Sequence, residues 1–173
     1  MKKFNWIKNN SILVLDTVFK LANCKKLQDY CFELICANPL PLITSNNFPP
    51  LDEDILFDLL KRDDLQIEEI VVWDCLIRWG IEQTPGLESK NNNRIKWNQE
   101  NFKALKKTLS QFISLIRFAE ISPADFFNKI YCYKIVIPHH IFKEVAEFYH
   151  KGILPKKNKY DTSHSIDNNQ QLS

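Results

Sequence analysis

Hydrophobic residues recur every three or four positions along most of the chain, which is the spacing of one face of an α-helix. Ile12, Leu15 and Phe19 follow this spacing between Ser11 and Asn23 and predict a short first helix. A second helix is predicted over residues 24–37. Its inward positions are Leu27, Cys31, Leu34 and Ile35.

Residues 39–50 contain four prolines and predict a loop, with one short turn around Leu42 to Asn46. A third helix is predicted after Asp52, whose carboxylate is suited to cap its first turn. The buried positions of this helix are Ile55, Leu56, Leu59 and Leu60.

The most apolar stretch covers residues 68–82. Val71 and Val72 also suit a strand, but the length of the stretch and the spacing of Trp73, Leu76 and Gly80 favour a helix. Because apolar residues occur nearly all round this helix, we expect it to lie at the centre of the core.

Residues 83–98 are polar and read as the clearest internal loop. Asn98 is then suited to cap a fifth helix. Its predicted inward positions are Phe102, Leu105, Leu109, Phe112, Ile113 and Ile116.

Two further helix starts follow. Ser122-Pro123-Ala124-Asp125 combines a capping serine, a proline at the first helical position and an acid in the first turn. The helix after it is predicted to bury Phe126, Phe127 and Ile130. Pro138 opens the last helix, with Ile141, Phe142, Val145 and Phe148 inward and with Gly152 and Pro155 as its stop.

About seven helices are therefore expected, and they predict an all-α fold. We expect an orthogonal helical bundle or a short stack of helix pairs. Residues 153–173 are polar and predict a disordered tail or linker.

Composition narrows the function classes. The chain has 173 residues but only three glycines, so a glycine-rich phosphate loop is not available. The formal net charge is only +2, which disfavours binding to nucleic acid or to a membrane surface. Residues 52–74 are rich in acids, and we attribute most of these to favourable positions near helix starts.

Candidate chemical groups do not form a recognisable motif. Five cysteines without a C-x-x-C pair predict small buried side chains and a reducing compartment, the cytoplasm or the nucleus. His139 and His140 are adjacent, so their rings point in different directions on a helix. We therefore expect no catalytic residue, metal site or cofactor. Trp6 and Trp97, which stand among polar residues, are the candidates for an exposed patch.

At residues 59–80 the sequence resembles the centre of the BACK domain, in which a leucine-rich helix precedes an L-x-V-x-S-E turn and a helix ending near a tryptophan. Leu59-Leu60, the stretch DDLQIEEI at 63–70 and Trp79-Gly80 carry the resemblance. The turn is one residue shorter than usual. Glu69 matches the glutamate of the pattern and no serine precedes it, so the hydroxyl cap is missing.

The resemblance extends over residues 4–152. Upstream it includes Trp6-Ile7 with Asn9, and Leu27 with Tyr30-Cys31. Downstream it includes the stretch FISLIRF at 112–118, Ile121-Ser122-Pro123 with Asp125-Phe126, and Ile137-Pro138. Proteins with this pattern often carry a BTB/POZ domain before the BACK domain and Kelch repeats or a TLDc domain after it.

The resemblance implies a non-catalytic adaptor rather than an enzyme. In such adaptors the BTB domain forms a homodimer and binds a cullin scaffold, and a C-terminal domain holds the substrate for ubiquitylation. The first helix pair, residues 11–37, is then the favoured partner surface. Residues 1–10 would be the remnant of a BTB junction, residues 11–152 the BACK-like domain, and the chain the middle of an adaptor. The alternative is a helical protein-binding module unrelated to ubiquitin.

Overall fold

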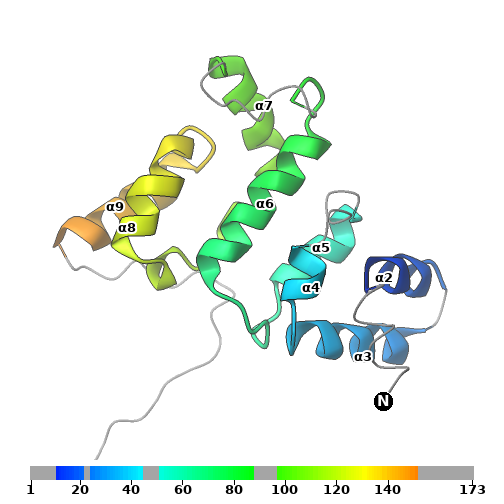
Figure 1. The fold of residues 1–173 in the computed structure, drawn as a ribbon. Coiled ribbons are helices and arrows are strands. Elements are labelled where there is room, and N and C mark those ends of the chain that lie inside the picture. Colours follow the sequence, from blue (N-terminus) through cyan, green and yellow to red (C-terminus); the bar gives the residue numbers. More distant parts are fainter. Residues whose placement is uncertain (1–10, 22–23, 45–50, 88–96, 152–173) are drawn as a thin grey trace, which may run out of the picture.

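The computed structural model describes residues 11–21, 24–44, 51–87 and 97–151, and within these ranges the fold is all-α, as predicted (Figure 1). No strand occurs in the described ranges. The α-helices are α2 (Ser11–Lys20), α3 (Lys25–Cys36), α4 (Leu40–Ile43), α5 (Glu53–Leu60), α6 (Glu69–Gln83), α7 (Gln99–Leu109), α8 (Pro123–Asp125) and α9 (His139–Lys151). The 3₁₀ turns are η2 (Ile113–Leu115), η3 (Phe118–Glu120) and η5 (Tyr131–Tyr133), and η4 (Phe126–Ile130) is π-helical.

Helix α6 lies at the centre of the molecule, which confirms the prediction from its apolar composition (Figure 1). Trp73 and Trp79 on this helix are almost fully buried. The Trp79 ring packs edge-on against Phe112, with the centroids 5.1 Å apart, and its Nε1 donates a hydrogen bond to the carbonyl oxygen of Leu51 at 2.8 Å. One indole thus joins α6 to the segments before α5 and after α7.

The predicted cap of α5 is present. The Asp52 carboxylate accepts hydrogen bonds from the backbone N–H groups of Asp54 and Ile55 at 3.0 and 3.4 Å. Helix α6 has no such cap, because the side chain of Glu68, its N-cap residue, makes no capping hydrogen bond. The missing hydroxyl cap inferred from the sequence is therefore confirmed.

Helix α7 begins where Asn98 predicts. Asn98 and Asn101 exchange side chain to backbone hydrogen bonds at 3.0 Å in a capping box. The helix ends at Leu109, however, and does not continue to Ile116. The hydroxyl of Ser110 donates to the carbonyl oxygen of Lys107 at 3.0 Å, an alternative to helix continuation. The inward positions beyond it, Phe112, Ile113 and Ile116, are nonetheless buried.

The segment after Ser122 corrects one predicted core position. Ser122 Oγ accepts a hydrogen bond from the Asp125 N–H at 3.1 Å, so the predicted start is confirmed. Phe126 and Ile130 are fully buried, but Phe127 is 46% exposed. Only three residues of α8 precede the π-helical turn η4, which is wider than an α-helical turn. In this turn Phe126 and Ile130, four positions apart, both face the core, and Phe127 faces solvent.

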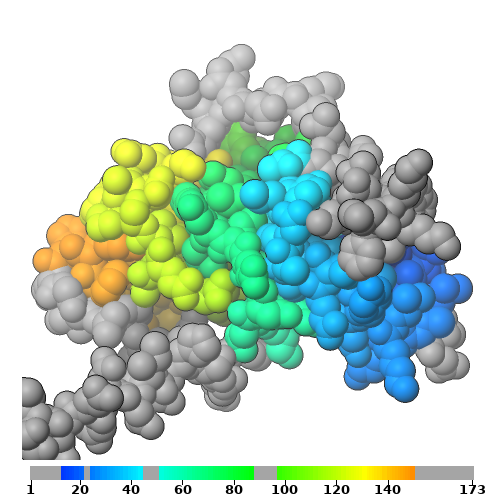
Figure 2. All heavy atoms as spheres, turned by 60° about the horizontal axis from the view of Figure 1, so that its bottom comes forward, coloured from blue at the N-terminus to red at the C-terminus, as the bar shows by residue number. Residues whose placement is uncertain are grey.

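The molecule is elongated, with the N-terminal helices at one end and α9 at the other (Figure 2). Helices α2 and α3 form the first end, α6 lies between, and α8 and α9 form the second end (Figure 1). Within the described ranges, none of the helices is both long and apolar enough to cross a membrane. Residues 1–10, 88–96 and 153–173, for which a junction, part of a loop and a tail were predicted, lie outside the described residues.

Candidate protein-binding surface

Helices α2 and α3 pack against each other through a small apolar interface. Leu15 is fully buried, and the rings of Phe19 and Phe32 meet edge-on with centroids 5.0 Å apart. Gln28 Nε2 donates a hydrogen bond to the carbonyl oxygen of Val18 at 3.4 Å. These contacts cover one face of each helix and leave the other to solvent.

Large apolar side chains are exposed on these two helices and directly after α2. Leu13, Leu21, Leu27 and Tyr30 are between 44% and 57% exposed. We call these four residues the apolar outer face. They are four of the seven large hydrophobic side chains that are exposed in the described part of the chain. A concentration of this kind is typical of a surface that another protein covers.

Leu27 corrects a prediction, because it was expected to face inward and is 44% exposed. The buried stripe of α3 runs through Cys31, Phe32, Ile35 and Cys36. Phe32 and Cys36 were not predicted to be inward. Because they are buried, the centre of the buried face of α3 lies further round the helix than predicted, and Leu27 falls outside that face. The same shift leaves Tyr30 exposed.

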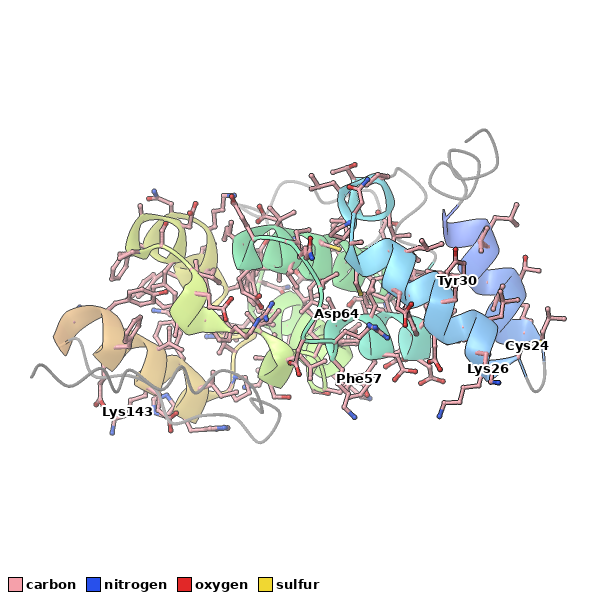
Figure 3. All side chains as sticks on the ribbon, turned by 90° about the horizontal axis from the view of Figure 1, so that it is seen from below. Cys24, Lys26, Tyr30, Phe57, Asp64 and Lys143 are labelled. Carbon is pink, nitrogen blue, oxygen red and sulfur yellow. The ribbon has the colours of Figure 1, made fainter. Side chains whose placement is uncertain are left out.

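The charge beside the apolar outer face is positive at the start of α3. Lys25 and Lys26 occupy the first turn, which has no acid and no side-chain cap at Cys24. Cations there add to the positive end of the helix dipole and do not stabilise the helix. Lys26 and Tyr30 stand one turn apart on α3 (Figure 3), so a basic group and an exposed aromatic ring share one face.

Of the two tryptophans predicted to form an exposed patch, Trp97 does not extend this surface. Trp97 is half-buried, and its ring packs edge-on against Phe102 and Tyr133 with centroid distances of 5.2 and 6.3 Å. It thus belongs to the core around α7 and η5. Its burial was not predicted, because its neighbours in the sequence are polar. Trp6 lies outside the described residues.

Three of the five cysteines, Cys31, Cys36 and Cys75, are buried and have the environment of unreactive thiols, whereas Cys24 and Cys132 are partly exposed and correct the prediction that the cysteines are buried. None of the five is in a disulfide. Burial raises the pKa values of Cys31 and Cys75, and raises that of Cys36 to about 11. A raised pKa keeps a thiol protonated and therefore weakly nucleophilic. In the described ranges, no three His, Cys, Asp or Glu side chains gather as a metal ion would require.

A groove of about 670 Å³ lies between the start of α5, the end of α6 and the middle of α7. Polar groups that line it already bond within the protein. Thr84 Oγ1 donates to the carbonyl oxygen of Gly80 at 2.6 Å and lies 2.8 Å from Thr108 Oγ1, and Trp79 donates to Leu51. These lining groups therefore serve packing, and we assign no ligand to the groove.

Comparison with known families locates the surface in a named domain. The family model BTB And C-terminal Kelch, abbreviated BACK, matches residues 17–91. The match supports a BACK domain fragment in this part of the chain. It includes the last four residues of α2 and all of α3 to α6, so Leu21, Leu27 and Tyr30 of the apolar outer face lie inside the matched range and Leu13 lies before it. The resemblance read from the sequence was wider, at residues 4–152.

The comparison with solved structures returned no match for this chain. Glu69, which the sequence aligned with the glutamate of the BACK pattern, lies within the matched range at the start of α6. The described residues after the match, 97–151, hold α7, α8, α9 and the short turns between them.

Proposed function

We propose that the chain is the non-catalytic spacer of a BTB–BACK adaptor that links substrates to a cullin-RING ubiquitin ligase. The BACK domain match at residues 17–91 is the observation that carries this proposal. BACK is an adaptor-type domain without catalytic activity, and the buried, protonated thiols fit such a role. No cofactor, nucleic acid or membrane takes part in the proposed function.

The elongated shape suits a spacer, because α2 and α3 stand at one end and α9 at the other (Figures 1 and 2). A spacer holds two partners at a fixed separation and so raises the local concentration of one near the other. The proposed division of the chain is a BTB junction at 1–10, a BACK-like domain at 11–152 and a linker at 153–173. The proposed compartment is the cytoplasm or the nucleus.

In this proposal the first helix pair, residues 11–37, completes the cullin contact together with a BTB domain. The apolar outer face supplies the apolar centre of the contact, and exposed Leu27 and Tyr30 are suited to enter pockets of the partner. Lys25 and Lys26 favour a partner that is acidic at its rim. Homodimerisation would come from the BTB domain.

A pull-down tests this function with a BTB domain joined to the N-terminus of the full chain and with the N-terminal half of a cullin as prey. We expect the joined protein to retain more cullin than the BTB domain alone. Leu27→Asp should reduce the retained cullin roughly tenfold or more, because a charge would enter the apolar centre of the contact. Tyr131→Ala is the matched control, since Tyr131 is equally exposed but distant in the fold.

Failure of the joined protein to retain cullin would contradict the ubiquitin ligase role. The second candidate, a helical protein-binding module unrelated to ubiquitin, rests on the same apolar outer face. It predicts that Leu27→Asp weakens binding to a non-cullin partner, again with Tyr131→Ala as the control.

A further inference from the structure

Glu69 is the one charged side chain that is buried among the described residues. It lies in the first turn of α6, and its side chain is 2% exposed. Both oxygens bond to a single residue, Arg117. Oε1 accepts from the Arg117 backbone N–H at 2.8 Å, and Oε2 accepts from Nε at 3.1 Å and from a terminal guanidinium nitrogen at 3.0 Å.

Arg117 directly precedes η3, in the link between the short turns η2 and η3. Its φ and ψ angles of −87° and 69° are not helical, so its N–H has no partner from a regular helix. Glu69 supplies that partner across 48 residues of sequence. The start of η3 is thereby attached to α6.

The other side of η3 is attached to α9. The hydroxyl of Tyr149 lies 2.6 Å from the carbonyl oxygen of Phe118 and 2.7 Å from that of Ile121. These carbonyls belong to the first residue of η3 and to the residue after it. Burial raises the pKa of Tyr149 to about 12, so the hydroxyl keeps the proton that it shares between them.

Other contacts between α6 and the C-terminal segment are less directional. Trp73 packs against Phe118 and Tyr133 with centroid distances of 5.8 and 5.9 Å. Such apolar contacts stabilise the joint between α6 and the C-terminal segment. They permit small rotations of one against the other, because the hydrophobic effect does not depend on direction. The ion pair of Lys129 with Asp74, at 2.8 Å, is half-exposed and contributes little.

We propose that η3 is a latch, held by Glu69 of α6 and by Tyr149 of α9, that fixes the orientation of the C-terminal helices relative to α6. This inference deepens the proposed spacer function, since a spacer sets a distance only if its two ends are rigidly joined. Glu69 and Tyr149 are then positioning residues. They act on the geometry of the chain and touch no partner.

The latch is tested by a distance measured in the chain alone, so its outcome is independent of whether cullin binds. Spin labels are placed at Lys26→Cys and Lys143→Cys, two positions near opposite ends of the molecule (Figure 3). Cys24 and Cys132, which are partly exposed, are replaced by serine so that only the two chosen sites react. Pulsed electron spin resonance then gives the distribution of distances between the labels.

We expect one narrow distribution for the otherwise unchanged chain. Glu69→Gln and Tyr149→Phe should each broaden it at least twofold, while the circular dichroism signal of the helices persists. Asp74→Asn is the matched control, because it removes a half-exposed ion pair in the same joint and should leave the width unchanged.

Tyr149→Phe removes one oxygen and serves as the test if Glu69→Gln does not fold. A folded Glu69→Gln or Tyr149→Phe variant with an unchanged width would overturn the proposal. So would an equal broadening by Asp74→Asn, because the joint would then have no specific latch.

Discussion

The side chain of Leu109 occupies the space that a β-carbon at Gly80 would need. A β-carbon added to Gly80 would lie 2.5 Å from Leu109 Cδ2, 2.9 Å from Leu109 Cγ and 3.0 Å from Leu105 Cδ1. Both leucines are fully buried, so neither has open space into which to turn. The glycine therefore sets how closely α6 and α7 approach.

Gly80→Ala is expected to destabilise the protein. Alanine favours an α-helix over glycine by about 1 kcal/mol, but overpacking a buried interface costs roughly 1–3 kcal/mol. We expect a net loss of about 1 kcal/mol in the free energy of unfolding, measured by urea denaturation. Combined with Leu109→Ala, the substitution should cost less than the two single changes together, since the cavity accepts the new methyl group. A stabilised Gly80→Ala variant would contradict this packing.

The apolar outer face should bind a hydrophobic fluorescent dye in the chain alone. Replacing Leu27 with Asp and Tyr30 with Ser should reduce the fluorescence. Because both side chains are exposed, the free energy of unfolding should change by no more than about 0.5 kcal/mol. Equal dye fluorescence before and after the double replacement would show that these residues do not form an accessible apolar surface.

Glu69 should give the stability of the protein a specific pH dependence. Burial is the largest influence on this carboxyl group and raises its pKa, against the lowering effects of the Arg117 N–H and guanidinium. The folded state therefore binds the proton more tightly than the unfolded state does. Protonation of Glu69 therefore stabilises the folded state. This contribution is fully present when the pH is below 4.5, the pKa of the group in the unfolded chain, and it is lost as the pH rises through the higher pKa of the folded state.

The measurement compares the free energy of unfolding of the unchanged chain with that of Glu69→Gln, from pH 7 down to pH 4. Glutamine does not titrate, so subtracting its values removes the contributions of other groups, Asp64 among them, whose own pKa is lowered by Arg62. Glu120 and Arg117 face the site in both proteins. The free energy of unfolding of the unchanged chain minus that of Glu69→Gln should increase as the pH falls. A difference that is constant or moves the other way would contradict the burial effect.

Local sequence signals predicted much of the fold. The caps at Asp52, Asn98 and Ser122 were each identified, because a cap depends on residues only two or three positions apart. The central position of α6 followed from its apolar composition. The exposure of Phe127 was not predicted, since it depends on a π-helical turn that the hydrophobic spacing does not encode.

Contacts between distant residues were not accessible from the sequence. Glu69 and Arg117 both lie in stretches that resemble the BACK pattern, but they are 48 positions apart and nothing in the spacing of the two stretches indicates that they pair. In the same way, Trp97 has polar neighbours in sequence, and only the fold brings Phe102 and Tyr133 to its ring. The candidate site was predicted as a helix pair. The exposed residues of this pair could not be predicted, because they depend on which face of α3 packs against α2.

The central claim, that a partner binds at the α2–α3 end of this helical spacer, is tested most directly by lysine cross-linking followed by mass spectrometry. The sample is the complex of a cullin with the full chain joined to a BTB domain. Lys26 on α3 and Lys143 on α9 mark the two ends of the molecule (Figure 3). We expect cross-links from cullin to Lys25 and Lys26. Cross-links confined to Lys134 and Lys143, or no complex at all, would contradict it.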